Sequence, residues 1–421
     1  MPTRARRVLP FAGLTLGVAM GLANVMSYVF VALVSSTLGP ADFGGFSALN
    51  TYGVLLAMPA GAFQVVVARR QTTTDREIGS QVTGLLPALA VGCTLAAATI
   101  AVSPLIRDGL RLDSAWSAVW MALMLPPMTV TGALQGVLLG RESYGRLSTV
   151  YLVTAGTRVV AALAATGLDF TVVEVFASIF TASLVTLVVA LVLTRADLTT
   201  GRAAPRPLVL LADLVRSNIA LAGLMALSSL DVVLARSVLG DHDSGAYALA
   251  ALFGKVVFWG TQFVALAVVP SVAGADEGNV RATLHRSAAG VLAIGLVVAL
   301  GCAVLPGPLV AITGGSAFVD AEPLLVWFAL IGTLWAVIQV WLFAGMSRDD
   351  HVMTLVVWVA AGVQSALVLL WLHDSPAQVL TAVGGTAAIV ALVGLLRVPG
   401  DEVTPGPGSA ETSEALGLTR E

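Results

Sequence analysis

Long apolar runs follow one another along the whole chain, each close to the roughly 20 residues that a helix needs to cross a bilayer. Lipid offers no hydrogen-bond partner to the backbone, so membrane spans of this length are expected to be helices. Charged residues, Gly and Pro separate the runs and predict twelve spans, with residue ranges 11–38, 43–68, 82–105, 116–140, 148–168, 172–194, 213–238, 245–271, 284–305, 323–345, 352–372 and 376–397.

Composition supports a membrane protein, because 57% of the 421 residues are hydrophobic and only 11% are charged. A soluble domain carries roughly 25% charged residues. Arg4, Arg6 and Arg7 precede the first apolar run and resemble the start of a signal peptide. That run is too long for a cleaved signal, whose apolar region spans roughly 7–15 residues. We therefore expect an uncleaved first span.

The arginines of the loops predict the orientation, because cytoplasmic loops are enriched in Lys and Arg. One set of alternate loops is rich in arginine, whereas the opposite set holds only Arg107 and Arg111 and several acids. Both termini are therefore expected in the cytoplasm, and the Ala/Val/Leu/Arg bias favours a bacterial cytoplasmic membrane. The arginine-rich set comprises Arg4, Arg6, Arg7, Arg69, Arg70, Arg76, Arg141, Arg146, Arg195, Arg202, Arg206, Arg281, Arg286, Arg348 and Arg397.

The chain divides into two halves of six spans each. Residues 1–194 form the predicted N-terminal bundle, 195–212 a cytoplasmic linker with Gly and Pro, and 213–397 the C-terminal bundle. The tail, 398–421, has almost nothing to bury and is expected to be disordered. These features predict an all-α integral membrane fold of about 12 transmembrane helices, in two six-helix bundles around a central cavity.

An internal repeat relates the two halves. LVSSTLGPADFG at 33–44 matches LARSVLGDHDSG at 234–245 with one constant offset. The shared residues predict a helix stop at Gly39 and Gly240, followed by an acid near the start of the next helix. Because each half has an even number of spans, the halves are expected to be parallel repeats. Transporters of this kind bind substrate between their halves and rock one half against the other.

Residues 35–70, SSTLGPADFGGFSALNTYGVLLAMPAGAFQVVVARR, resemble the first two spans of bacterial polysaccharide flippases. These flippases, of the O-antigen and teichoic-acid type, belong to the multidrug/oligosaccharidyl-lipid/polysaccharide exporter superfamily. The resemblance rests on Leu38-Gly39-Pro40, then Asp42-Phe43-Gly44, and a second span closing on Arg69-Arg70. The resemblance implies two helical bundles arranged as a V around a central cavity. It also implies that the protein moves lipid-linked sugars from the inner to the outer leaflet. Family members that carry pyrophosphate-linked cargo are expected to line the cavity with several basic residues, whereas the first span here offers Asn24.

Charged residues inside spans are costly and usually face the bundle interior or water. Arg158, Asp231 and Lys255 are predicted near the membrane midplane, and Arg236 near a span end, from which it could snorkel. Our hypothesis is that Arg158 and Lys255 hold the phosphate of a lipid-linked sugar. Asp231 would balance Lys255 or bind a coupling proton or sodium ion; alternatively, Asp231 and Lys255 form a structural pair.

Uncharged polar residues are weaker candidates. Asn24 and Gln364 are predicted near the midplane and are candidate cavity residues, although polar groups between membrane helices mostly hold helices together. No metal-binding or disulfide pattern is present, and no phosphate-binding loop. We therefore expect no cofactor, and neither a metal nor a nucleic-acid partner.

Three functions remain open. A flippase or exporter of a lipid-linked oligosaccharide or polysaccharide precursor accounts for the topology, the repeat and the midplane charges. An ion-coupled multidrug or small-molecule antiporter of the same superfamily would need a functional acid in the N-terminal half, and the first six spans have no acid at the midplane. A polyprenyl-dependent membrane glycosyltransferase would need clustered acids or histidines on extended periplasmic loops. The sequence therefore favours a transporter over an enzyme.

Overall fold

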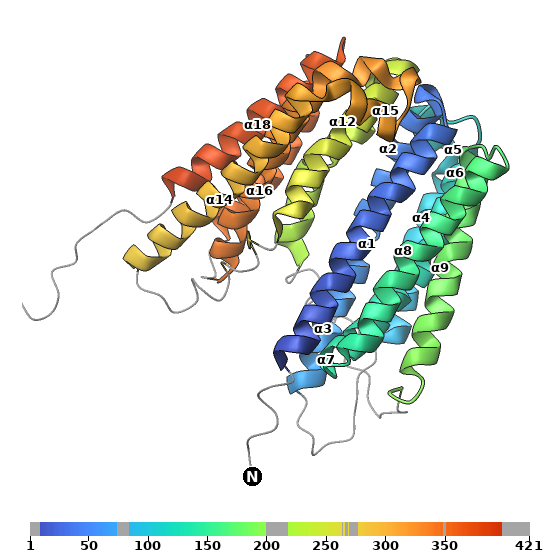
Figure 1. Ribbon diagram of the computed structural model, residues 1–421. Coiled ribbons are helices and arrows are strands. Elements are labelled where there is room, and N and C mark those ends of the chain that lie inside the picture. The colour runs from blue at the N-terminus through green and yellow to red at the C-terminus, as the bar shows by residue number, and fades with distance from the viewer. Residues whose placement is uncertain are drawn as a thin grey trace, which may run out of the picture.

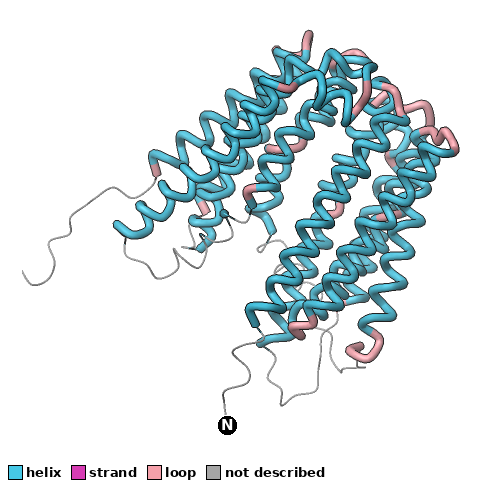
Figure 2. The backbone as a smooth tube through the Cα atoms, viewed as in Figure 1, coloured by secondary structure: helices cyan, strands magenta, loops and turns pink. Residues whose placement is uncertain are grey.

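The computed structural model describes residues 9–73, 84–198, 218–262, 264–265, 268, 277–347 and 351–397. In these ranges the chain forms helices joined by short turns and contains no strand (Figure 2). The helices of the N-terminal half are α1 (Leu9–Thr37), α2 (Pro40–Leu56), α3 (Met58–Thr73), α4 (Leu85–Ala101), α5 (Ser103–Gly109), α6 (Ala115–Leu123), α7 (Leu125–Gly140), α8 (Tyr144–Gly167) and α9 (Val172–Thr194).

The C-terminal half begins with helical residues 218–227, which precede α11. Its other elements are α11 (Leu230–Val238), α12 (Asp241–Gly260), α14 (Glu277–Val304), α15 (Pro306–Thr313), the 3₁₀ helix η2 (Ser316–Ala321), α16 (Glu322–Ser347), α17 (Val352–Leu370) and α18 (Pro376–Leu396).

The predicted spans agree closely with these helices. In the described ranges, ten helical stretches are long and apolar enough to cross a membrane, and the bent pair α4 and α5 makes an eleventh. The remaining prediction, 245–271, overlaps α12 and continues into residues of which only a few are described. The all-α membrane fold with about 12 spans is confirmed.

Prolines break several of these spans, because proline lacks the N–H that continues the helical hydrogen-bond ladder. The second span is interrupted at Ala57, just before Pro59, and the fourth at Met124, before Pro126. Pro104 opens α5, which is bent by 60° from α4. The apolar pattern predicts where the chain crosses the membrane, and the prolines set where each crossing bends.

The two halves repeat the same packing. In the N-terminal half α1 contacts α8, both α3 and α4 contact α7, and α8 contacts α9. The C-terminal half has the matching contacts of α11 with α17, of α12 and α14 with α16, and of α17 with α18. The halves meet at one end and diverge toward the other (Figure 1). We call these the closed end and the open end; α1 begins and α18 finishes at the open end.

Glycines of the sequence repeat form the contact between the halves. The repeat predicts helix stops at Gly39 and Gly240. The preceding helices α1 and α11 end two residues earlier, at Thr37 and Val238, and the two glycines are the N-cap residues of α2 and α12. One turn later, a Cβ on Gly44 would lie 2.7 Å from Ser244 Oγ, and one on Gly245 only 1.9 Å from the Pro40 carbonyl oxygen. Equivalent residues of the two repeats therefore allow α2 and α12 to cross at backbone distance near the closed end.

Some predictions fall on residues outside the described ranges. These are the Arg4, Arg6 and Arg7 cluster, most of the linker (199–212) and the tail (398–421). The described arginines of the arginine-rich loops, such as Arg141 and Arg195, lie at the open end, whereas Arg107 and Arg111 lie at the closed end. The division of basic residues between the two ends therefore follows the alternation in the sequence.

Candidate functional site

A cavity of about 360 Å³ lies between the two halves. Its walls come from α1, α2 and α8 on one side, and from α12 and residues between 225 and 232 on the other. Polar groups line part of it, including Asn24, Asn50 and Ser229, among aromatic and aliphatic side chains such as Tyr28. The cavity therefore combines an apolar surface with a few polar groups from both halves, as ligand sites commonly do.

Two basic side chains, Arg158 of α8 and Lys255 of α12, line this cavity from opposite halves, and no acidic side chain of the described residues lines it. Neither one makes a hydrogen bond or an ion pair within the described part of the chain. An unpaired cation in a membrane span costs roughly 2.5–3.5 kcal/mol on insertion scales. Two such cations facing one cavity give it a positive potential that an anionic ligand would neutralise.

Asp231 lies beside the cavity but does not line it. Its side chain is 0% exposed, and it accepts a hydrogen bond of 3.1 Å from the Tyr247 hydroxyl. The other carboxylate oxygen is buried without a partner among the described residues. Asp231 interacts electrostatically with Lys255, and no direct ion pair joins the two side chains in the described part of the chain.

The structure places the two uncharged candidates in different environments. Asn24 lines the cavity together with Arg158 and Lys255. Gln364 is buried away from it, where its amide donates to the Leu227 carbonyl (3.2 Å) and its oxygen accepts from the Thr386 hydroxyl (3.0 Å). Three of the five predicted site residues therefore share one cavity, whereas Gln364 joins α17 to α18 and to the segment before α11.

A smaller pocket of about 270 Å³ lies inside the N-terminal half, between α3, α7, α8 and α9. Arg158 lines this pocket as well as the central cavity. Its other polar lining includes Gln135 and Tyr151. The sequence did not reveal this pocket, because its polar residues come from three separate helices, α7, α8 and α9.

A larger hollow, of about 910 Å³, lies between α16 and α18 in the C-terminal half. Its lining is mostly Leu, Ile, Pro and Gly, with Trp327 more than half exposed. An exposed apolar groove on a membrane helix pair contacts lipid chains, so its size alone does not make it a ligand site.

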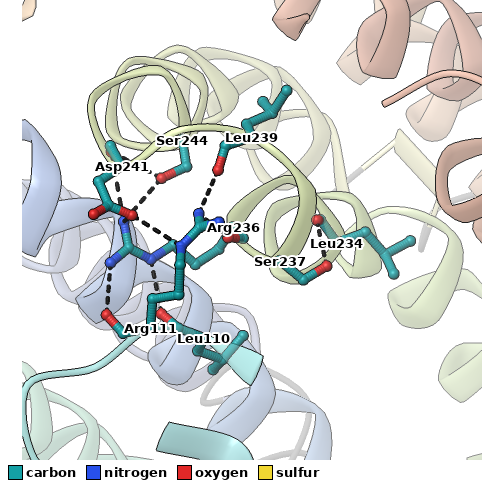
Figure 3. A network of polar contacts seen from close by, with 8 residues as sticks. All are labelled: Leu110, Arg111, Leu234, Arg236, Ser237, Leu239, Asp241 and Ser244. Carbon is teal, nitrogen blue, oxygen red and sulfur yellow. Dashed lines mark hydrogen bonds and ion pairs between the residues drawn. The ribbon is translucent and has the colours of Figure 1, made fainter. Parts of the chain in front are cut away.

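A network of charged and polar groups joins the halves at the closed end (Figure 3). Arg236 of α11 donates to the carbonyls of Leu110 (2.8 Å) and Arg111 (3.0 Å), which follow α5 in the other half. In return, Arg111 forms an ion pair with Asp241 at 2.9 Å and donates to the carbonyls of Arg236 and Leu239. We call Arg111, Arg236 and Asp241 the closed-end latch.

The latch corrects one interpretation of the sequence. Arg236 does not snorkel to the membrane surface, because its side chain is only 4% exposed and is held by partners from both halves. Besides the two carbonyls, it contacts Asp241 (3.2 Å) and the Ser244 hydroxyl (3.0 Å). In the sequence Arg111 is recognisable only as a loop charge, because no local pattern links it to a residue 125 positions away.

Comparison with solved structures identifies the fold. No known family model matches the sequence, and no curated protein matches it. An inward-facing multidrug resistance MATE family transporter of the MOP superfamily superposes with a TM-score of 0.73 at 13% identity, over 91% of this chain and 96% of that one. The lipid II flippase MurJ, in an inward closed conformation, gives a TM-score of 0.71 at 11% identity, over 91% and 87%.

An outward-facing MATE family transporter gives a lower TM-score, 0.59, at 16% identity over 91% of this chain and 94% of that one. The chain therefore has the fold of MOP superfamily transporters, a class of multi-span helical membrane proteins. Its arrangement, with halves that meet at one end and diverge at the other, is more similar to the inward-facing structure than to the outward-facing one. At these identities the likeness concerns the fold.

Proposed function

We propose that this protein is a flippase that carries a lipid-linked oligosaccharide or polysaccharide precursor across the bacterial cytoplasmic membrane by alternating access. The observation that carries the proposal is the charge of the central cavity, where Arg158 and Lys255 form no ion pair with any described residue and the described lining contains no acid. A polyprenyl phosphate or pyrophosphate head group would supply the missing anion. The polar groups beside them, such as Asn24, suit a sugar.

The proposed orientation places the arginine-rich open end, with both termini, in the cytoplasm. The cavity would then accept substrate from the inner leaflet, while the latch closes the far side. Transport requires the halves to separate at the closed end and meet at the open end. Asp231 remains a candidate for a coupling proton or sodium ion, because one carboxylate oxygen is buried without a partner in the described part of the chain.

A multidrug antiporter is the second candidate, because MATE transporters share the fold. A cationic drug would be repelled by a cavity that is lined by Arg158 and Lys255 and has no acid among its described lining residues. A membrane glycosyltransferase is less well supported, because the described helices are joined by short turns and not by the extended loops that such an enzyme would need. The fold and the sign of the cavity charge together favour the flippase.

The proposal is tested by depleting the protein in its host and locating polyprenyl-linked glycan intermediates by leaflet, while surface polysaccharide is measured in parallel. A flippase predicts intermediates trapped in the inner leaflet and loss of surface glycan, both reversed by the intact gene. Unchanged intermediates and unchanged surface glycan, in a strain without a second transporter of this kind, would favour the antiporter.

Moving a lysine from one wall of the cavity to the opposite wall tests the positive potential of the cavity more directly. Val54 occupies the position of α2 that the repeat offset relates to Lys255, and both side chains line the cavity. Lys255→Met should abolish export with normal membrane abundance, whereas Val54→Met, the matched control, should not. The double variant Val54→Lys/Lys255→Met should restore part of the export, because it returns one cation to the same cavity. Normal export by Lys255→Met would contradict the proposal.

A further inference from the structure

The pocket inside the N-terminal half presents hydrogen-bond donors from two helices. Thr131 and Gln135 lie four residues apart on α7, and Tyr151 and Arg158 seven residues apart on α8, so each pair shares a helix face. All four side chains line the pocket, and none of its described lining residues is acidic. The donors therefore converge on one pocket.

The hydroxyl of Thr131 indicates that a partner is missing. It is buried and has no hydrogen-bond partner among the described residues. By contrast, the hydroxyls of Thr154, Ser183 and Thr186, which line the same pocket, donate to carbonyls of their own helices. Leaving a buried hydroxyl unsatisfied costs roughly 1–3 kcal/mol, so the free Thr131 hydroxyl marks where a ligand would bind.

The neighbouring groups are also free to donate. The Gln64 amide donates to the Tyr151 hydroxyl at 2.7 Å, so the hydroxyl accepts this bond and keeps its own proton for another partner. Gln135 and Arg158 form no hydrogen bond within the described part of the chain. Three neutral donors and one guanidinium therefore point to an acceptor of negative charge.

We propose that this pocket is a binding site for a small monovalent anion such as chloride, held by Arg158, Thr131, Tyr151 and Gln135. One guanidinium without a carboxylate in the lining matches one negative charge. The volume of about 270 Å³ suits an ion with part of its hydration shell and is small for an oligosaccharide. The central cavity, by contrast, has cations from both halves and opens onto more apolar surface.

Arg158 connects this site with the central cavity, since its side chain lines both. A guanidinium that binds the small anion is less available to the substrate phosphate. This part of the inference rests on the proposed function: the arriving phosphate would take Arg158 and release the anion, so the two would compete. In the absence of substrate, the small anion would then neutralise the charge of Arg158.

Equilibrium binding of radioactive chloride to the purified full chain, in gluconate buffer, tests the site. The wild type should bind chloride saturably. Arg158→Gln should abolish binding, and Thr131→Val, which keeps the side-chain shape, should weaken it roughly fivefold through the loss of one hydrogen bond. Lys255→Gln, the matched control, should retain binding because Lys255 lines only the central cavity.

Any other pattern overturns the assignment. Absence of saturable binding removes the site, and loss of binding in Lys255→Gln with retention in Thr131→Val moves the anion to the central cavity. A melting curve of each variant without chloride checks that the protein is folded. The assay uses no lipid-linked substrate, so it can succeed even if the flippase proposal fails. Competition is tested separately: chloride should weaken polyprenyl phosphate binding to the wild type, and equal binding in chloride and gluconate would contradict it.

Discussion

Two arginines within the helical spans, Arg236 at the closed end and Arg158 at the central cavity, are in opposite situations. Arg236 is 4% exposed and donates to Leu110, Arg111 and Ser244, with Asp241 as its counter-ion. Arg158 makes no such contact in the described ranges, although it lines two cavities. A buried cation with all its partners within the protein holds structure together, whereas one without partners is available to a ligand.

The same contrast separates the two sides of the closed end. Positions 35 and 236 are related by the repeat offset. Each side chain donates a hydrogen bond to a backbone carbonyl at or just after the C-terminus of a short helix in the opposite half. Ser35 donates to the Thr313 carbonyl at the end of α15, and Arg236 to the Leu110 carbonyl after α5. One neutral bond on one side therefore corresponds to a charged network on the other. The closed end has two-fold symmetry in its backbone and not in its chemistry.

The largest effect is expected from Arg236→Met. It leaves the Leu110 and Arg111 carbonyls without this donor and removes one of the two arginines paired with Asp241. It should destabilise the closed end by about 3 kcal/mol, the low end for a buried ion pair because Asp241 is 52% exposed. That corresponds to a population shift of roughly 100-fold toward separated halves. Spin labels replacing Gly109 and Gly240, which have room for a side chain, would report a longer distance in a Cys93→Ser/Cys302→Ala background. An unchanged distance distribution would show that the latch does not hold the halves together.

Arg158→Met should act in the opposite direction on stability. It removes a cation that has no partner among the described residues and whose placement in the membrane costs roughly 2.5–3.5 kcal/mol on insertion scales. The expected result is an equal or higher melting temperature in detergent with loss of transport. A lower melting temperature would indicate that Arg158 has a structural partner, and the contrast with Arg236 would no longer hold.

Gly245→Ala tests the close backbone contact between α2 and α12 at the closed end. The added Cβ would lie 1.9 Å from the Pro40 carbonyl oxygen, so α2 and α12 must move apart. Overpacking of this kind costs typically 1–3 kcal/mol. The control is Gly39→Ala, whose Cβ would meet nothing within 4 Å. Equal distances between the spin labels in the two variants would mean that the crossing of α2 and α12 does not set the closed state.

The smallest effect is expected from Ser35→Ala. It removes one neutral hydrogen bond, worth about 1 kcal/mol, between α1 and the end of α15. The shift toward separated halves should therefore be several-fold, well below that of Arg236→Met in the same spin-label measurement. A shift as large as that of Arg236→Met would mean that the two sides stabilise the closed end equally.

Hydropathy was sufficient to predict the spans, because each helix must hide its backbone from lipid and therefore appears as an apolar run of fixed length. The predicted 172–194 coincides with α9, and 352–372 differs from α17 by two residues. The repeat motif was also informative, since Gly44 and Gly245 lie where the halves touch. Both features are local in sequence.

The site was only partly predictable. Charges inside spans are conspicuous, so Arg158 and Lys255 were found, whereas Asn24 and Gln364 had the same predicted depth and proved to lie in different surroundings. Depth along a helix can be counted in the sequence, but the direction in which a side chain faces depends on how the helices pack. For the same reason the latch between Arg111 and Arg236 could not be predicted.

The most direct test of the account is the binding of a polyprenyl phosphate to the purified protein, measured for the wild type, for Val54→Met and for the double variant Arg158→Gln/Lys255→Gln. Charge-assisted hydrogen bonds contribute roughly 1.5–3 kcal/mol each, so the double variant should lose at least about 100-fold in affinity. Val54→Met should bind as the wild type does. Wild-type affinity in the double variant would contradict the claim that the two unpaired cations of the central cavity recognise an anionic lipid-linked substrate.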